Sequence, residues 1–390
     1  MGKKPLIILL LIGALLLSGC YDKFEMGETM VVVAHGLDTD GNSKLISAQL
    51  ALTPPREGQL EPGPKFIVVS SSALSFAEAG RILSLSLPRR PLWSMADTII
   101  IGEKLAELDS GLFTDLLLRN PRLRYNVQLF VAKGVFPSEI LEAEVFPEDY
   151  SGTALENIID NQRGQAGIYI PVDIKDFLFK TGTAGIEPVL PQIIMEKSEN
   201  QAKLKLQGTA VFKGRQMVGS LDEQQTRGLA LLNPKSIHRT VFNIKSPGHG
   251  EETSELKLYD TMAMELTSYQ IQVKPLINGN NITMNIIMEA KGNIIEDNNN
   301  HNISDPEMVS SIEREAARVL RQYIHSCIEQ AQSLNSDILG WGLAISRSHP
   351  KTWMEIEASW PDMFAGISSN IQVKYELQQS YLLNDAFPFK

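Results

Sequence analysis

The sequence predicts an α+β protein with two or three domains. Its 390 residues exceed the roughly 100–200 residues that one domain usually needs. In the first third of the chain, short apolar strand segments alternate with helical segments, which favours a sheet with at least one crossover connection. In the last third, alternating strand segments flank one long amphipathic helical segment, which predicts an antiparallel sheet covered by a helix.

Residues 1–19 have the features of a bacterial lipoprotein signal peptide. Two lysines precede an apolar run of 12 residues, 6–17, which is too short to span a hydrocarbon core about 30 Å thick. The run ends in Leu-Ser-Gly-Cys at residues 17–20, which has the form of a lipobox. A cysteine thiolate can accept a diacylglyceryl group, and two acyl chains hold a protein stably on a membrane. We therefore predict that Cys20 is lipidated and anchors the mature chain to membrane lipid.

The segment 20–133 is expected to form an N-terminal α/β domain. A hairpin is predicted from two apolar strands, 30–34 and 45–52, joined by a polar turn. A capping box at Ser75 begins a helix that Pro88 ends. The remaining expected elements are a helix over 110–119 and strands over 66–69, 98–101 and 127–132.

A middle domain is expected over 134–232. Its first part, to about residue 190, is mostly helical in pattern, and a meander of short strands follows over 192–219. The Asn-Pro pair at 233–234 is a suitable boundary.

The segment 233–390 is expected to form a C-terminal α+β domain. Two alternating strands, 269–273 and 282–290, flank an Asn-Gly-Asn turn and predict a hairpin. A helix with an apolar stripe is expected from Pro306 to about Leu334, and an alternating strand follows over 371–377. Cys327 falls on the apolar stripe, which indicates a buried, inert thiol.

No recognisable catalytic or cofactor-binding motif occurs in the sequence. Walker A, GxGxxG, GxSxG and HExxH patterns are absent, and the six histidines form no close pair that would predict a metal site. The 36 Lys and Arg against 46 Asp and Glu give a net charge of −10, which argues against nucleic acid as a partner. We therefore expect no enzyme activity, no cofactor and no metal.

Five residues are candidate contacts with a protein partner: Arg119, Arg122, Arg124, Trp353 and Trp360. Arginine and tryptophan are frequent anchors of protein interfaces. Alternatively, the three arginines form ion pairs with carboxylates of this acidic chain and contact no partner. The two tryptophans are seven residues apart and would share one face of a helix, so core packing is their alternative.

Several segments occur in the order that one family shows. They are residues 21–25, 87–93, 98–106, 116–124, 131–134, 208–213, 218–221 and 337–342, followed by Pro350, Trp353 and Trp360. Together with the lipobox, they resemble the Ger(x)C spore germination lipoproteins, the C subunits of nutrient germinant receptors. The family usually has Trp where this chain has Tyr21, and often His where it has Met95.

The resemblance implies three α+β domains, each with a mixed or antiparallel sheet flanked by helices. It also implies a non-catalytic, lipid-anchored subunit on the outer face of the inner spore membrane, in complex with integral A-type and B-type receptor subunits. A solute-binding lipoprotein of a transporter is the alternative, and it would require two doubly wound lobes around a ligand cleft. A lipid-anchored hydrolase would need a nucleophile–base pair, which the sequence does not show.

Overall fold

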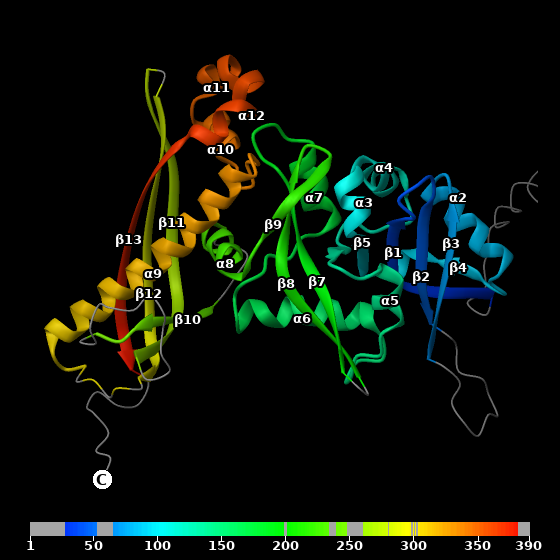
Figure 1. Cartoon of the computed structure of the whole chain (residues 1–390), viewed down its shortest axis with the longest axis horizontal. Helices are drawn as coiled ribbons and strands as arrows, with labels where there is room; N and C mark the ends of the chain where they lie inside the picture. Colours follow the sequence, from blue (N-terminus) through cyan, green and yellow to red (C-terminus); the bar gives the residue numbers. More distant parts are fainter. Residues whose placement is uncertain are drawn as a thin grey trace, which may run out of the picture.

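The computed structural model describes residues 28–52, 65–198, 201–233, 239–247, 260–279, 281–297, 299, 301 and 303–380. Two β-sheets follow one another along the long axis of the molecule, the N-terminal one at the blue-to-green end and the C-terminal one at the yellow-to-red end (Figure 1). In these ranges, no helix combines the length and apolar character needed to cross a bilayer.

The N-terminal sheet has nine strands in a mixed arrangement. Its order is β3-β2-β1-β5-β6-β7-β8-β9, and the short β4 pairs with β1. Parallel pairs join β1, β5, β6 and β7 in the centre, while antiparallel pairs build both ends. The strands are β1 (Thr29–Thr39), β2 (Leu45–Leu52), β3 (Phe66–Ala73), β4 (Arg90–Leu92), β5 (Thr98–Gly102), β6 (Gln128–Ala132), β7 (Val189–Ser198), β8 (Gln201–Lys213) and β9 (Gln216–Leu221).

Helices cover both faces of this sheet. On β5, Ile99 and Ile101 pack with residues of α2, α3, α4 and α7, whereas Ile100 packs with residues of α5 and α6. This division follows from the alternation of side chains along a strand. The helices are α2 (Phe76–Ile82), α3 (Glu103–Leu108), α4 (Gly111–Arg119), α5 (Pro137–Glu142), α6 (Ser151–Gly164), α7 (Ile174–Thr181) and α8 (Glu223–Leu232), with the 3₁₀ turns η2 (Leu83–Leu85) and η3 (Trp93–Met95).

The first two predicted domains share this one sheet, so the expectation of a separate sheet in each was wrong. The connection is the parallel pairing of β6 with β7, in which Val131 and Ala132 face Gln192 and Ile193. The chain between them forms α5, α6 and α7, which act as the crossover that parallel strands require. The boundary at residues 133–134 itself stays a prediction.

The C-terminal sheet has four strands, in the order β10-β11-β12-β13. The predicted hairpin is confirmed, since β11 pairs antiparallel with β12 over almost their whole length. However, β13 runs parallel to β12, so the expected purely antiparallel sheet was wrong. The helices between β12 and β13 carry the chain back to the end of the sheet at which β12 begins, so β13 can run in the same direction as β12. The strands are β10 (Thr240–Lys245), β11 (Thr261–Asn278), β12 (Asn281–Asp297) and β13 (Ser368–Ser380).

The predicted long helix is α9 (Pro306–Ser333), which lies along this sheet (Figure 1). Its apolar stripe packs with the buried side chains of the sheet. Its N-cap is Asp305, whose carboxylate accepts a hydrogen bond from the backbone N–H of Glu307. Cys327 is buried on the stripe as predicted, and burial raises the pKa of its thiol, which keeps it protonated. The helices α10 (Trp341–Ser348), α11 (Pro350–Ile356) and α12 (Trp360–Met363) follow, with 3₁₀ turns η5 (Glu357–Ser359) and η6 (Phe364–Gly366).

The two sheets are joined by close packing of α8 against α9. A side chain at Gly228 of α8 would overlap the backbone of Tyr323 on α9, so only glycine allows this approach. Further along, the side-chain amide of Gln330 donates to the carbonyl of Ser220 at 3.2 Å.

Candidate functional site

The structure places Trp353 and Trp360 in the core, not at the surface. Their side chains are 6% and 3% exposed, and the two rings make an edge contact with centroids 5.6 Å apart. The short helices α11 and α12 both bury their tryptophan in the core, where Trp360 packs against Phe364 and Phe364 against Trp341. This corrects the expectation of aromatic partner contacts, because a buried ring offers a partner no surface.

The tryptophans surround a buried carboxylate, Asp337. Its oxygens accept hydrogen bonds from the backbone N–H groups of Trp341 at 3.0 Å and Gly342 at 2.8 Å, and from the indole N–H of Trp360 at 3.0 Å. Burial raises the pKa of Asp337 to about 6, although these hydrogen bonds oppose the shift. We call Asp337 and these three donors the Asp337 cluster. All three donors are paired with the carboxylate, so the cluster stabilises the packing of this region.

The three arginines differ from one another. Arg124 donates to the carboxylate of Asp97 and to the carbonyl of Ala96, which ties its loop to the start of β5. Arg119 is exposed on the last turn of α4 and pairs with Asp115 at 2.7 Å. Ion pairing within the chain therefore accounts for these two guanidinium groups. Arg122, which is exposed in the loop after α4, makes no ion pair with any described residue.

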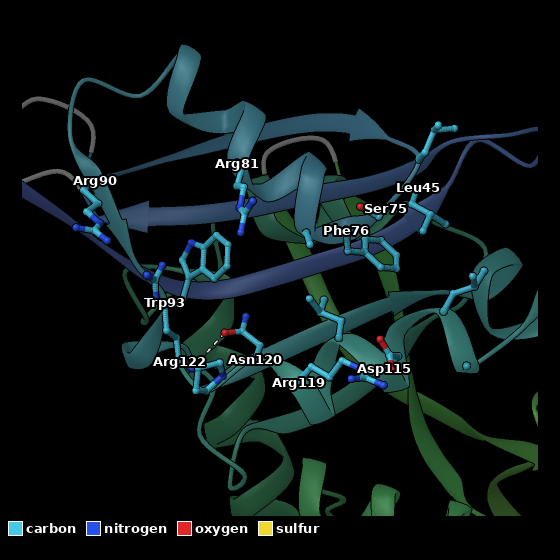
Figure 2. Close-up of a pocket in the computed structure, with 16 residues that line it drawn as sticks. Leu45, Ser75, Phe76, Arg81, Arg90, Trp93, Asp115, Arg119, Asn120 and Arg122 are labelled. Carbon is cyan, nitrogen blue, oxygen red and sulfur yellow. Dashed lines mark hydrogen bonds and ion pairs between the residues drawn. The ribbon is translucent and has the colours of Figure 1, made fainter.

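Arg119 and Arg122 line a groove between α2 and α4, which we call the α2–α4 groove. It has a volume of about 780 Å³, and Figure 2 shows it open between the two helices. Its apolar lining includes Phe76, Leu112 and Leu116. Such a volume lies within the range of roughly 300–1,000 Å³ typical of small-molecule sites.

The charged lining of the groove is mostly positive. Four arginines contribute to it, Arg81, Arg90, Arg119 and Arg122, against the single carboxylate of Asp115. Figure 2 shows Arg81 and Arg122 extending toward Trp93 from opposite walls, while Arg119 is turned to Asp115. In a chain with a net charge of −10, this is a local concentration of positive charge.

Behind the groove lies a smaller space, which we call the inner cavity. Its volume of about 20 Å³ is enough for roughly one water molecule. Phe76, Trp93, Leu116 and Asn120 line both spaces, so the two spaces adjoin each other. The inner cavity lies on the sheet face covered by α2 and α4, beside His35 of β1 and Gln49 of β2.

Three buried polar atoms at the inner cavity have no hydrogen-bond partner within the described protein: Nε2 of His35, Oε1 of Gln49 and Nε1 of Trp93. His35 and Gln49 are direct neighbours across β1 and β2, which places both side chains on one face of the sheet. The imidazole and the indole make an edge contact with ring centroids 5.9 Å apart. Burial lowers the pKa of His35 to about 4, so the imidazole is neutral at pH 7.

Sequence reasoning missed this site. His35 counted as one of six scattered histidines, and Trp93 only as part of a family segment. The usable signal was Gln49, the one amide inside a mostly apolar predicted strand. Which residue it faces depends on the strand register, which the sequence did not reveal. Cys20 lies outside the described residues.

Comparisons with known proteins agree with this fold. Residues 22–195 match the family described as spore germination protein N-terminal domain, and residues 207–381 match the family described as spore germination B3/GerAC like, C-terminal. The crystal structure of the GerBC protein superposes with a TM-score of 0.57 at 18% identity, covering 88% of this chain and 96% of that chain. At this identity, the likeness concerns the fold.

Curated relatives cover nearly the whole chain. The putative spore germination protein YfkR of Bacillus subtilis (strain 168) is 25% identical over 389 residues, which is 96% of each protein. Spore germination protein KC of the same organism is 22% identical and covers 92% of this chain and 91% of its own length. Because the two family matches together span residues 22–195 and 207–381, this chain belongs to the GerAC family of spore germination proteins, as the resemblance of its motifs predicted.

Proposed function

We propose that this chain is a non-catalytic, membrane-anchored lipoprotein subunit of a spore nutrient germinant receptor. The observation that carries the proposal is the match of both spore germination families along the chain. The relative named spore germination protein KC, with a similar length, supports the same role.

The anchor in this proposal is a diacylglyceryl group on Cys20. It is supported by the order of the N-terminal features: positive residues, a short apolar run and a lipobox. The folded body would then lie on the outer face of the inner spore membrane.

The partners in this proposal are the integral A-type and B-type receptor subunits, and the chain would trigger germination through contacts with them. Arg119 and Arg122 remain candidates for such contacts because both side chains are exposed. Arg124 is tied to Asp97 and is the weaker candidate. Trp353 and Trp360 are not carried further, since both are buried.

The alternative, a solute-binding lipoprotein of a transporter, finds no support in the architecture. It requires two doubly wound lobes around a cleft, whereas the described chain has one nine-stranded mixed sheet and one four-stranded sheet beside it.

Substitution of Cys20 tests the anchor. Cys20→Ala should leave a longer, unlipidated chain and release it from the spore membrane fraction, because the acylated thiol is absent. Mass spectrometry of the N-terminal peptide and membrane fractionation measure this, with germination rate as the functional readout. Cys327→Ala is the matched control and should stay lipidated. A wild-type N-terminus that starts elsewhere, or an unmodified Cys20, would contradict the proposal.

A further inference from the structure

We propose that the α2–α4 groove binds a small organic anion, with an apolar body along α4 and a hydroxyl or amine end that reaches the inner cavity. This property goes beyond the role proposed above and does not depend on it. Charge, shape and unpaired polar atoms support it independently.

Two arginines that line the groove have no ion-pair partner among the described residues. Neither Arg81 nor Arg122 makes an ion pair with any described residue, whereas Arg119 is already occupied by Asp115. The two lie on opposite walls near Trp93 (Figure 2). A carboxylate or phosphate placed between them would accept hydrogen bonds from both, and such charge-assisted bonds are the stronger kind.

The groove also has an apolar lining. Leu112 and Leu116 lie one helical turn apart on α4 and, with Phe76 of α2, provide apolar lining of the groove. A ligand with only a charged group, such as inorganic phosphate, would leave this surface in water. An apolar body attached to the anion would cover it and gain from the burial.

The inner cavity supplies the third argument. Buried polar groups are almost always paired in native proteins, and one left without a partner costs stability. Here the Trp93 indole offers a donor, Gln49 Oε1 offers an acceptor, and the His35 ring nitrogen is the third unpaired atom. A hydroxyl or amine can donate and accept at once, so one such group could pair with several of them. Because groove and cavity share four lining residues, this position adjoins the groove in which the anion would lie.

A small molecule fits these observations better than an acidic protein segment. A segment of a partner would lie along the outer groove and leave the inner cavity untouched. The cavity holds only about one water-sized group, which matches a single ligand substituent.

The experiment measures binding of four probes to the full-length chain in detergent by isothermal titration calorimetry. The probes are phenylacetate, its neutral analogue phenylacetamide, 4-hydroxyphenylacetate, and hexaglutamate as an acidic peptide. We expect phenylacetate to bind with a Kd on the order of 1 mM or tighter, and phenylacetamide to bind about tenfold more weakly because it lacks the charge. The added hydroxyl of 4-hydroxyphenylacetate should strengthen binding several-fold.

Variants locate the site. Arg81→Gln and Arg122→Gln should each weaken phenylacetate binding about tenfold. Arg314→Gln removes an exposed guanidinium from α9, far along the chain from the groove, and is the matched control that should change nothing. In Gln49→Leu, phenylacetate should still bind, but the advantage of the hydroxyl should disappear.

Four outcomes would overturn the proposal. Equal affinity for phenylacetate and phenylacetamide would mean apolar adsorption only, and an equal loss in Arg314→Gln would mean a general charge effect. Binding of hexaglutamate without binding of phenylacetate would assign the groove to an acidic protein segment. A hydroxyl that adds nothing would leave a structural water as the occupant of the inner cavity. The experiment uses no receptor subunit and no spore, so its failure would leave the proposed germination role untouched.

Discussion

In the C-terminal region, the indole N–H of Trp360 donates to the buried carboxylate of Asp337. In the N-terminal region, the indole N–H of Trp93 lies beside the buried imidazole of His35 and has no hydrogen-bond partner among the described residues. Each region thus combines a tryptophan with a buried titratable group. The Asp337 cluster has every donor paired, whereas the inner cavity leaves three polar atoms unpaired.

The difference separates a structural role from a binding role. A fully paired polar cluster stabilises its region and keeps a single arrangement. An unpaired one costs stability, and real proteins accept such costs mainly at functional sites. The unpaired cluster is also the one that adjoins an open groove, while the Asp337 cluster is enclosed by packed aromatic rings.

The largest expected effect is a pH dependence of opposite sign at the two clusters. Burial lowers the pKa of His35 from 6.5 to about 4, so the folded protein binds fewer protons there than the unfolded chain, and stability is lost as the pH falls from 6.5 through 4. Burial raises the pKa of Asp337 from 3.8 to about 6, so its contribution is present at low pH and is lost as the pH rises through 6. Each amounts to about 3 kcal/mol in full, at 1.36 kcal/mol per pKa unit.

Urea unfolding between pH 4 and 7 measures these contributions by difference, since in the wild type they offset each other. Relative to His35→Gln, the wild type should lose about 3 kcal/mol on acidification. Relative to Asp337→Asn, it should gain stability over the same range. If the unfolding free energy of wild type and variants changed with pH in the same way, the pKa shifts assigned to His35 and Asp337 would be contradicted.

A matched pair of substitutions gives the next largest effect. Trp360→Phe removes a donor from Asp337 and leaves a void in a packed core, so it should cost about 2 kcal/mol of unfolding free energy. Trp93→Phe removes the same atoms, but its N–H has no partner to lose and the side chain is only half-buried, so the cost should stay below about 1 kcal/mol. Thermal unfolding of both variants checks this. Equal losses of stability in the two variants would contradict the distinction between the Asp337 cluster and the inner cavity.

The smallest expected effect is a gain in stability on substitution of a buried side chain. Gln49→Leu replaces a fully buried amide, whose Oε1 has no hydrogen-bond partner among the described residues, by an apolar side chain of similar size. It should stabilise the protein by about 1 kcal/mol. Denaturant unfolding would detect the gain, with Gln192→Leu as a control on the same sheet, since its amide is also buried without a partner but lies away from the inner cavity. A loss of stability at Gln49 would show that this amide is paired in solution.

Local patterns predicted the elements well and their long-range pairing poorly. The strand at 98–101 became β5 and the helix from Pro306 became α9, because each is determined by its own apolar periodicity. By contrast, the pairing of β6 with β7 and the parallel direction of β13 depend on where intervening helices carry the chain. No local periodicity carries that information.

The candidate site shows the same division. Arg119 and Arg122 could be selected by residue type, and the structure does place them together on one groove. The residues that give the inner cavity its polar lining, His35 and Gln49, meet only through the register of β1 and β2. The spacing of Trp353 and Trp360 alone could not show whether the two side chains are buried or exposed. Residues seven apart share one face of a helix, and that face can point either to the core or to solvent.

The parallel pairing of β6 with β7 also decides where this chain can be cut. A fragment ending at Lys133 would keep β6 but lose its neighbour, and four of the five residues of β6 are buried in the intact protein. The bare strand would offer unpaired backbone groups and apolar side chains to other copies, which is the usual route to aggregation through a sheet edge. A fragment that ends after α8, near Asn233, retains all nine strands and has no such newly opened edge.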